Sequence, residues 1–438
     1  MKEKKWLAAC LALCISGAVS AQGIGTINEQ ETTRIISTLS HDNMQGRASF
    51  TLGIEKAADF ISGEFHDMGL QPLKSNGKNG AAAFRQSFNV YRITPAAVQA
   101  TLNGKVLKEE QLFASTSHEK IEWKKSKSRQ VVTIKEGENA REAFSKANKL
   151  EQDALVLVHP SHTETFNNYR RYLTRGGVKQ EIGKGSSKVF ILTDQPTPKK
   201  YKISINNKVE QLPLANVVGM IEGKRKNEIV VFSGHYDHIG IGHTVDGDSI
   251  ANGADDDASG TTAMMMLARY YKQQPQPERT LVFAAFTAEE IGGFGSKHFS
   301  GQLNPDSIVA MFNIEMVGKP SQFGPNSAYL TGFEKSDLGK LLQERLQGTA
   351  YSIHPDPYPQ QNLFYRSDNA TLARLGVPAH TISSVQIDKD ELYHTVNDEV
   401  ESLDMPHLTS MIRAIALAAQ GVVNGTVTPT RVDKSLVE

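Results

Sequence analysis

The segment IVVFSGHYD, residues 229–237, joins an apolar run to a histidine and an aspartate. A run without polar alternation predicts a strand buried on both faces, as in a parallel sheet covered by helices. The runs TLVFAAF (280–286) and IVAMFNIEM (308–316) have the same character, and residues 258–273 between the first two form a helix candidate. Strands that alternate with helices in this way predict an α/β fold.

Further patterns extend this architecture toward both ends of the chain. Helices are predicted over residues 29–40 and 53–68, where apolar side chains recur at helical spacing. Amphipathic segments follow at 336–346 and 402–423, and PAHTIS (378–383) is a short apolar strand. We therefore expect a mostly parallel central sheet sandwiched by helices.

Residues 90–210 have a different texture, rich in lysine and with little that indicates catalysis. They contain three short strand candidates, at 131–134, 154–158 and 189–192. We expect an inserted accessory α+β domain there, so that residues 22–89 and 211–438 form the catalytic domain. His159 and His162 are interpreted as solvated side chains, because no acidic residue at metal-site spacing accompanies them.

The N-terminus has the pattern of a secretory signal peptide. Three lysines precede an apolar stretch from Trp6 to Val19, and Val19-Ser20-Ala21 offers small residues for cleavage. Residues 1–21 are thus predicted to be removed after Ala21, which places the mature protein in the periplasm or the medium; an uncleaved anchor is the alternative. Because Cys10 and Cys14 are the only cysteines, the mature chain would have no disulfide and no thiolate metal ligand.

Length and composition limit the remaining options. A chain of 438 residues predicts two compact units or one large domain with an insertion. The formal net charge is zero, so no excess of basic residues indicates a nucleic-acid partner. After signal cleavage we also expect no membrane partner, and the sequence does not determine the oligomeric state.

Acidic residues and histidines follow the predicted strands at their carboxyl ends, where open α/β sheets bind ligands. They are His235 and Asp237 after the first strand, Asp255, Asp256 and Asp257 in the next loop, Glu289 and Glu290 after the second strand, Glu315 at the third, and Tyr393 and His394 near the chain end. Carboxylates that converge at one rim need cations, since burying them unpaired is costly. No lysine or arginine lies between Asn252 and Ala268 or between Leu281 and Ser296.

A metal is the simplest source of that positive charge. Histidine and carboxylate ligands without thiolate suit zinc, with manganese or cobalt as alternatives. The number of candidate ligands exceeds the three that a single catalytic zinc takes, so two metals that share one carboxylate are expected.

Five motifs, in this order, resemble the zinc exopeptidase family. They are GHYD (234–237), GADDDASG (253–260), AEE (288–290), NIEMVG (313–318) and YHT (393–395). That family includes the secreted bacterial two-zinc aminopeptidases, aminopeptidase Y, glutamate carboxypeptidase II and the glutaminyl cyclases. The resemblance covers residues 30–75 and 213–425, and the insertion occupies the place of the protease-associated domain of some relatives without a firm motif for it.

The resemblance implies two zinc ions per chain and a role for each motif residue. It implies that His235 binds the first zinc with Asp237 orienting its imidazole, that Asp256 bridges both metals, that Glu290 and His394 bind the second zinc, that Glu289 is the general base, and that Tyr393 polarises the substrate carbonyl. Glu315 stands where relatives mostly have aspartate, which puts the first metal site in question. His238, His243 and His380 match no ligand position. Ser367 or Asp368 is expected to cap a helix, although in relatives a similar Ser-Asp segment lies near the substrate pocket.

These features predict an exported two-zinc metallo-exopeptidase with a peptide substrate. An aminopeptidase is favoured, acting through a water shared by both metals with Glu289 as the general base. A carboxypeptidase of the same family, a glutaminyl-cyclase-like zinc acyltransferase with one metal, and a binding module that kept the fold without the chemistry are the alternatives.

Overall fold

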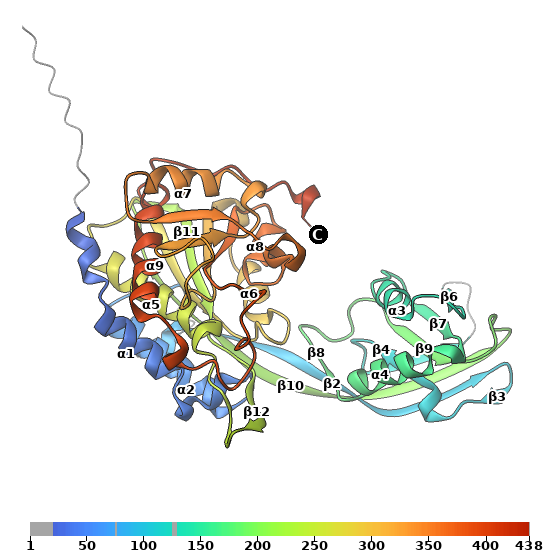
Figure 1. Cartoon of the computed structure of the whole chain (residues 1–438). Helices are drawn as coiled ribbons and strands as arrows, with labels where there is room; N and C mark the ends of the chain where they lie inside the picture. The colour runs from blue at the N-terminus through green and yellow to red at the C-terminus, as the bar shows by residue number, and fades with distance from the viewer. Residues whose placement is uncertain (1–20, 75–76, 125–128, 438) are drawn as a thin grey trace, which may run out of the picture.

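The computed structural model describes residues 21–74, 77–124 and 129–437 (Figure 1). The predicted signal peptide lies outside the described residues except for Ala21, so export stays a prediction. Within the described part of the chain, no helix combines the length and the apolar character needed to cross a bilayer.

One large sheet forms the centre of the molecule. Its strands are β1 (Gln71–Pro72), β2 (Arg85–Leu102), β3 (Lys105–Val106), β5 (Lys120–Lys124), β8 (Gly177–Lys179), β10 (Tyr201–Ile221), β11 (Arg225–His235), β14 (Arg279–Phe286), β15 (Ile308–Ile314), β16 (Ser327–Leu330), β17 (Ser352–Pro355) and β18 (Ala379–Ser383). The order along the sheet is β17-β16-β18-β15-β11-β14-β10-β2-β3. Strands β18, β15, β11 and β14 run parallel, and β16 and β10 flank them antiparallel.

Helices cover both faces of this sheet. One face carries α1 (Glu29–Leu39), α2 (Leu52–Asp67), α5 (Gly260–Lys272), α7 (Leu338–Leu346), α9 (Met405–Ala418) and α10 (Gln420–Val423). The other carries α6 (Phe294–Ser300) and α8 (Asn369–Ala373). The predicted α/β class, with a mostly parallel centre between helices, is confirmed.

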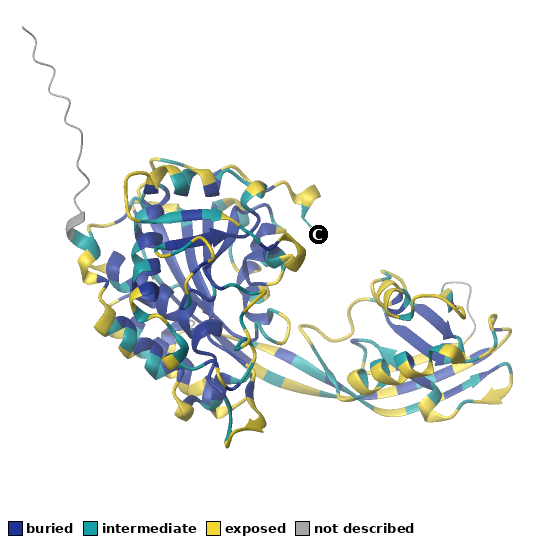
Figure 2. Ribbon diagram, viewed as in Figure 1, coloured by how far each residue is buried: buried dark blue, intermediate teal, exposed yellow. Residues whose placement is uncertain are grey.

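Alternation along β11 shows why the strand is apolar throughout. Val230 and Phe232 point into the core with α5 and α9, whereas Val231 points into the opposite core with α6 and α8. Each such side chain stabilises the fold by about 1.5–3 kcal/mol through burial. Figure 2 shows the central strands buried on both sides, while the helices expose their outer faces.

Beyond the pair of Ala97 with Asn206, the described residues between 97 and 206 form an outer lobe that projects from the main body, the described residues before 97 and after 206 (Figure 1). Strand β8 is the exception, because it pairs with Tyr91–Ile93 of the main body. The lobe contains a second sheet of β4 (Leu112–Ser115), β9 (Lys188–Leu192), β7 (Ala154–Val158) and β6 (Gln130–Ile134), with helices α3 (Ala140–Asn148) and α4 (Thr163–Thr174). All three strand candidates of this region are therefore strands.

The two parts are joined by a continuous strand pair. Strands β2 and β10 pair antiparallel from Arg85 with Val217 to Leu102 with Tyr201, and they shift register between Asn206 and Asn207. The expected domain boundaries at 90 and 210 fall inside these strands, because the same pair serves both parts. The assignment of an accessory domain stays a prediction. A hairpin of β12 (Gly240–Val245) and β13 (Asp248–Ala251) completes the described strands.

Candidate metal centre

Five segments that are distant in sequence meet at the carboxyl ends of the parallel strands. His235 is the last residue of β11, Glu290 follows β14, and Glu315 follows β15. Asp256 lies in the loop that leads into α5, and His394 comes from the loop after β18. The structure brings all five predicted ligands into two groups that share Asp256.

The first group consists of His235, Asp256 and Glu315, whose ligand atoms all lie within 4.8 Å of one another. His235 Nε2 is 3.2 Å from Asp256 Oδ1. Burial raises the pKa of Glu315 to about 7. A glutamate at this position therefore reaches the group even though relatives were expected to have an aspartate there.

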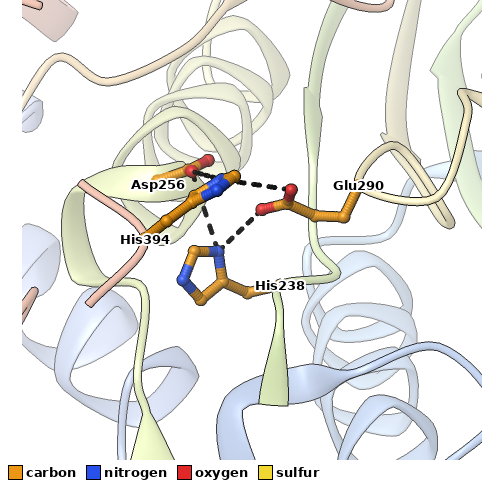
Figure 3. A group of neighbouring side chains, drawn as sticks. All are labelled: His238, Asp256, Glu290 and His394. Carbon is orange, nitrogen blue, oxygen red and sulfur yellow. Dashed lines mark hydrogen bonds and ion pairs between the residues drawn. The ribbon is translucent and has the colours of Figure 1, made fainter. Parts of the chain in front are cut away.

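The second group contains Asp256, Glu290 and His394, together with His238 (Figure 3). His394 Nε2 lies 3.1 Å from Asp256 Oδ2 and 3.2 Å from Glu290 Oε2. His238 Nδ1 lies 2.9 Å from Glu290 Oε1. Sequence reasoning set His238 aside; its place directly after His235-Tyr236-Asp237, at the end of the same strand, was the available signal.

The electrostatics of these groups call for positive charge. Hydrogen bonds to Asp256 and Glu290 raise the pKa of His394 to about 10. Burial lowers the pKa of His235, but Asp256 and its acidic neighbours outweigh burial and raise that pKa well above the usual value. His235 Nε2 and Glu315 Oε2 are buried without a hydrogen-bond partner among the described residues. Carboxylate and imidazole donors at this spacing fit zinc.

Each carboxylate of the triple aspartate has its own function. Asp257 accepts hydrogen bonds from the backbone N–H groups of His235 at 3.0 Å and Met316 at 3.2 Å, which ties β11 to the segment after β15. Asp255 accepts the N–H of Gly318 at 2.8 Å. Asp256 alone faces both ligand groups, so its neighbours hold the loop and it is left for the metal.

Asp237 contacts a different partner from the one expected. Its carboxylate accepts the backbone N–H groups of Glu289 at 3.0 Å and Glu290 at 3.3 Å. His235 Nδ1 lies 3.1 Å from the backbone oxygen of Asp237 but 3.8 Å from its carboxylate. The carboxylate therefore holds the Glu289–Glu290 turn, and the backbone oxygen orients the imidazole.

Glu289 and Tyr393 line a cavity beside both ligand groups. Burial raises the pKa of Glu289 well above its usual range, and the nearby carboxylate of Glu315 raises it further. Tyr393 stacks on the ring of His394 with 3.9 Å between centroids, and burial raises the pKa of its hydroxyl. A carboxylate that binds protons readily and a protonated hydroxyl thus face the same space.

Sequence reasoning missed Arg47, which is completely buried behind the centre. Its guanidinium donates to the backbone oxygens of Leu39 at 2.7 Å, Tyr236 at 2.8 Å, Asn252 at 2.6 Å and Gly253 at 2.9 Å. These bonds fix the loops that carry the ligands. The strand-end motifs lack cations because the fold brings this one from residues far away in the sequence.

A second cation approaches the triple aspartate from the other side. Lys319 Nζ lies 2.7 Å from Asp390 Oδ2, 3.6 Å from Asp255 Oδ2 and 3.8 Å from Asp398 Oδ1. Asp398 in turn accepts the backbone N–H of Asp256 at 3.0 Å. Arg47 and Lys319 balance part of the acidic charge, yet neither lies between the ligands.

Two other polar residues, Asp368 and His380, belong to neither ligand group. Asp368 occupies the N-cap position of α8, as expected, but its side chain makes no cap hydrogen bond there. Both of its carboxylate oxygens are buried without a hydrogen-bond partner among the described residues. His380 bonds through Nδ1 to the oxygen of Thr331 at 2.9 Å and through Nε2 to Ser336 Oγ at 2.7 Å. His380 is thus part of the core, in agreement with its exclusion from the ligands.

Similar proteins are found both by sequence and by structure. Aminopeptidase YwaD of Bacillus subtilis is 30% identical over 147 residues, which cover 32% of this chain and 28% of that protein. Leucine aminopeptidase 1 of Penicillium rubens is 28% identical over 209 residues, or 44% of this chain and 52% of that protein. The chain thus spans only part of the length of these relatives.

A solved zinc aminopeptidase from Bacillus subtilis has a TM-score of 0.55 at 18% identity and covers 91% of this chain and 96% of its own. At this identity the likeness shows the fold. Residues 216–419 match the family described as peptidase family M28, and that range contains all five strand-end motifs. This match confirms the resemblance drawn from the motifs: residues 216–419 of the chain are similar to peptidase family M28.

Proposed function

We propose that this protein is an exported metallo-aminopeptidase that holds two zinc ions and removes N-terminal residues from peptides. The observation that carries the proposal is the meeting of two ligand groups on one shared carboxylate, Asp256, beside a cavity. The relatives described above include a zinc aminopeptidase and a leucine aminopeptidase, and their names support both the metal and the reaction.

The residues present determine where the metals would be held. His235, Asp256 and Glu315 would hold one zinc, and Asp256, Glu290 and His394 the other. Zinc bound in such sites polarises a substrate carbonyl and lowers the pKa of a water molecule from about 15.7 toward about 7.

Glu289 and Tyr393 supply the proton transfers and the orientation. The Glu289 carboxylate takes a proton from the attacking water, and its raised pKa lets it hold that proton at Oε until the amine leaves. Glu289 then donates the proton to the leaving nitrogen. The Tyr393 hydroxyl donates a hydrogen bond to the oxygen that becomes negative in the transition state.

The preference for a free N-terminus over a free C-terminus rests on the names of the relatives, which are aminopeptidases. Four carboxylates line the cavity, from Asp256, Glu289, Glu290 and Glu315, and the one cationic side chain among its described lining residues is the exposed Arg366. Two bound zinc ions would offset the charge of these carboxylates, so the lining by itself does not select one terminus. The acyltransferase alternative is not favoured, because the named relatives are peptidases.

The direct test is hydrolysis of a panel of aminoacyl-nitroanilides by the purified protein, with and without a chelator. Cleavage that the chelator abolishes and zinc restores is expected. Mass spectrometry of a digested peptide library, half of it N-acetylated and half C-terminally amidated, then shows which end is trimmed. Trimming of N-acetylated peptides from the C-terminus would contradict the proposal, as would cyclisation of glutaminyl peptides without hydrolysis.

Export needs a separate measurement, because it rests on residues 1–21 alone. The full-length chain expressed with its own N-terminus is expected outside the cytoplasm with Gln22 as its first residue. N-terminal sequencing of the fractionated protein checks this expectation. A cytoplasmic chain that retains residues 1–21 would contradict export and leave the peptidase proposal standing.

A further inference from the structure

His238 is a buried histidine at the metal centre for which sequence reasoning found no ligand position. It is 1% exposed, and its backbone N–H bonds to the oxygen of Arg47 at 3.3 Å. Of its two ring nitrogens, Nδ1 faces the second ligand group, while Nε2 has no hydrogen-bond partner among the described residues. The imidazole therefore makes its polar contacts with the metal centre.

The neighbouring loop leaves room for this ring. A Cβ atom on Gly253 would lie 2.5 Å from His238 Cγ and 2.3 Å from the backbone oxygen of Asp256. Gly253 also has a φ of +57°, a backbone conformation that residues other than glycine rarely adopt. The glycine that opens the GADDDASG loop thus lets the His238 imidazole pack against the loop that carries Asp256.

The distances between the four polar side chains agree with ligands of one tetrahedral zinc. His238 Nδ1 lies 2.9 Å from Glu290 Oε1 and 3.8 Å from Asp256 Oδ2, and His394 Nε2 lies 3.1 and 3.2 Å from those two carboxylates (Figure 3). Ligands at about 2.0–2.1 Å from a tetrahedral zinc are separated by about 3.3 Å. The observed distances fall on both sides of that value.

On this geometry we propose that His238 is a fourth protein ligand of the Asp256–Glu290–His394 site. The inference rests on the proposed function, because it assumes that the centre holds zinc. Structural zinc sites are closed by four protein ligands, whereas catalytic ones have three and an open position. The two sites are then unequal in protein ligands: this one has four, and the His235–Asp256–Glu315 site has three.

A hydrogen bond from His238 to Glu290 is the competing explanation, and one variant separates the two. His238→Asn keeps an amide N–H near the position of Nδ1, so it preserves a hydrogen bond to Glu290 while removing the imidazole ligand. His380→Asn is the matched control, since His380 is equally buried but bonds to Thr331 and Ser336. Circular dichroism verifies that each variant is folded.

The readouts are zinc affinity, by competition with a chelator, and X-ray absorption of the protein loaded with two equivalents of zinc. We expect three imidazoles per two zinc ions in the wild type, including that of His235, and two in His238→Asn. The variant should also bind the first zinc on the order of 1000-fold more weakly, beyond the about 10–100-fold that loss of an outer partner costs. His380→Asn should match the wild type in both.

The possible outcomes distinguish the role of His238 from the proposed function. Only two imidazoles per two zinc ions in the wild type would overturn the inference even if His238→Asn fails to fold. An unchanged affinity in His238→Asn overturns it as well, and His238 is then a positioning residue for Glu290. A wild-type protein that binds no zinc overturns the proposed function itself, whereas intact zinc-dependent hydrolysis with only two imidazoles per two zinc ions overturns only the role of His238.

Discussion

The main body and the outer lobe share the strand pair β2–β10 but fill their interiors differently. At the strand ends of the main body, His235, Asp237 and Asp256 are each at most 2% exposed. The outer lobe packs aliphatic and aromatic side chains, including a stack of Phe113, Phe144 and Phe190. No group of metal-ligating side chains lies within the described residues of the lobe.

The contrast distinguishes two kinds of buried side chain. Apolar side chains stabilise the outer lobe by packing, whereas the buried acids of the main body surround the candidate metal sites. An apolar core needs only shape and volume, whereas each buried acid of the main body needs a donor or a cation to offset its desolvation. The main body meets that requirement with backbone N–H groups, Arg47 and Lys319. The acids that remain without such partners identify the place where a metal and a substrate are expected.

The largest expected effect is at the main body's reactive centre. Glu289→Gln keeps the size of the side chain but removes its ability to take a proton, so kcat should fall by at least about 10²–10⁴-fold. Zinc content should not change, because Glu289 belongs to neither ligand group. Steady-state kinetics and elemental analysis of the same preparation check both statements. Activity close to the wild type would show that another group is the base.

Arg47→Met tests the polar support of the main body. The substitution leaves the backbone oxygens of Leu39, Tyr236 and Asn252 without a donor, whereas that of Gly253 still accepts the N–H of Ala258. Each unpaired oxygen costs about 1–3 kcal/mol, so the free energy of unfolding should fall by at least about 3 kcal/mol. Arg129→Met is the matched change in the outer lobe, where Arg129 lies 4.7 Å above the ring of Trp123, and should cost about 1 kcal/mol. Urea unfolding measures both; equal losses would remove the contrast.

Local sequence patterns predict the strands and the residues of the candidate ligand groups, but not the residues that hold these groups in place. The apolar runs at 229–234 and 280–286 are visible because both faces of each strand are buried, and Glu290 is visible because it follows such a run. Arg47 gave no signal, because its partners are backbone oxygens at Leu39, Tyr236, Asn252 and Gly253 rather than side chains with a pattern. A residue that acts through distant backbone leaves no local periodicity.

The same limit explains two further differences. The sequence assigns no role to His238, because its neighbours Glu290 and His394 come from other loops. The boundaries at 90 and 210 were placed where composition changes, but hydrogen bonding continues through them along β2 and β10. A change in amino-acid composition reflects a change in the environment of a strand. It does not indicate the residue at which the strand ends.

His380 provides a pH test confined to the main body. Burial lowers its pKa from 6.5 to about 4, so the unfolded chain binds this proton first as the pH falls. The contribution of His380 to the free energy of unfolding is therefore fully present above pH 6.5. It falls by roughly 3 kcal/mol as the pH drops from 6.5 toward 4. His380→Asn should lose less stability than the wild type over this interval. Urea unfolding at a series of pH values checks this, and parallel curves would contradict it.

The smallest expected effect is in the outer lobe, where His159 and His162 belong to no group of candidate metal ligands among the described residues. His159 Nδ1 accepts the N–H of Ser161 at 3.3 Å, and His162 Nε2 lies 2.7 Å from the oxygen of Lys135. Both are local contacts at a turn, so replacing the two histidines by alanine should leave zinc stoichiometry unchanged and kcat/KM within about twofold, as for other surface substitutions. Elemental analysis and nitroanilide kinetics measure these quantities. Loss of one zinc equivalent would show that the outer lobe also binds a metal. The candidate metal sites would then no longer be confined to the main body.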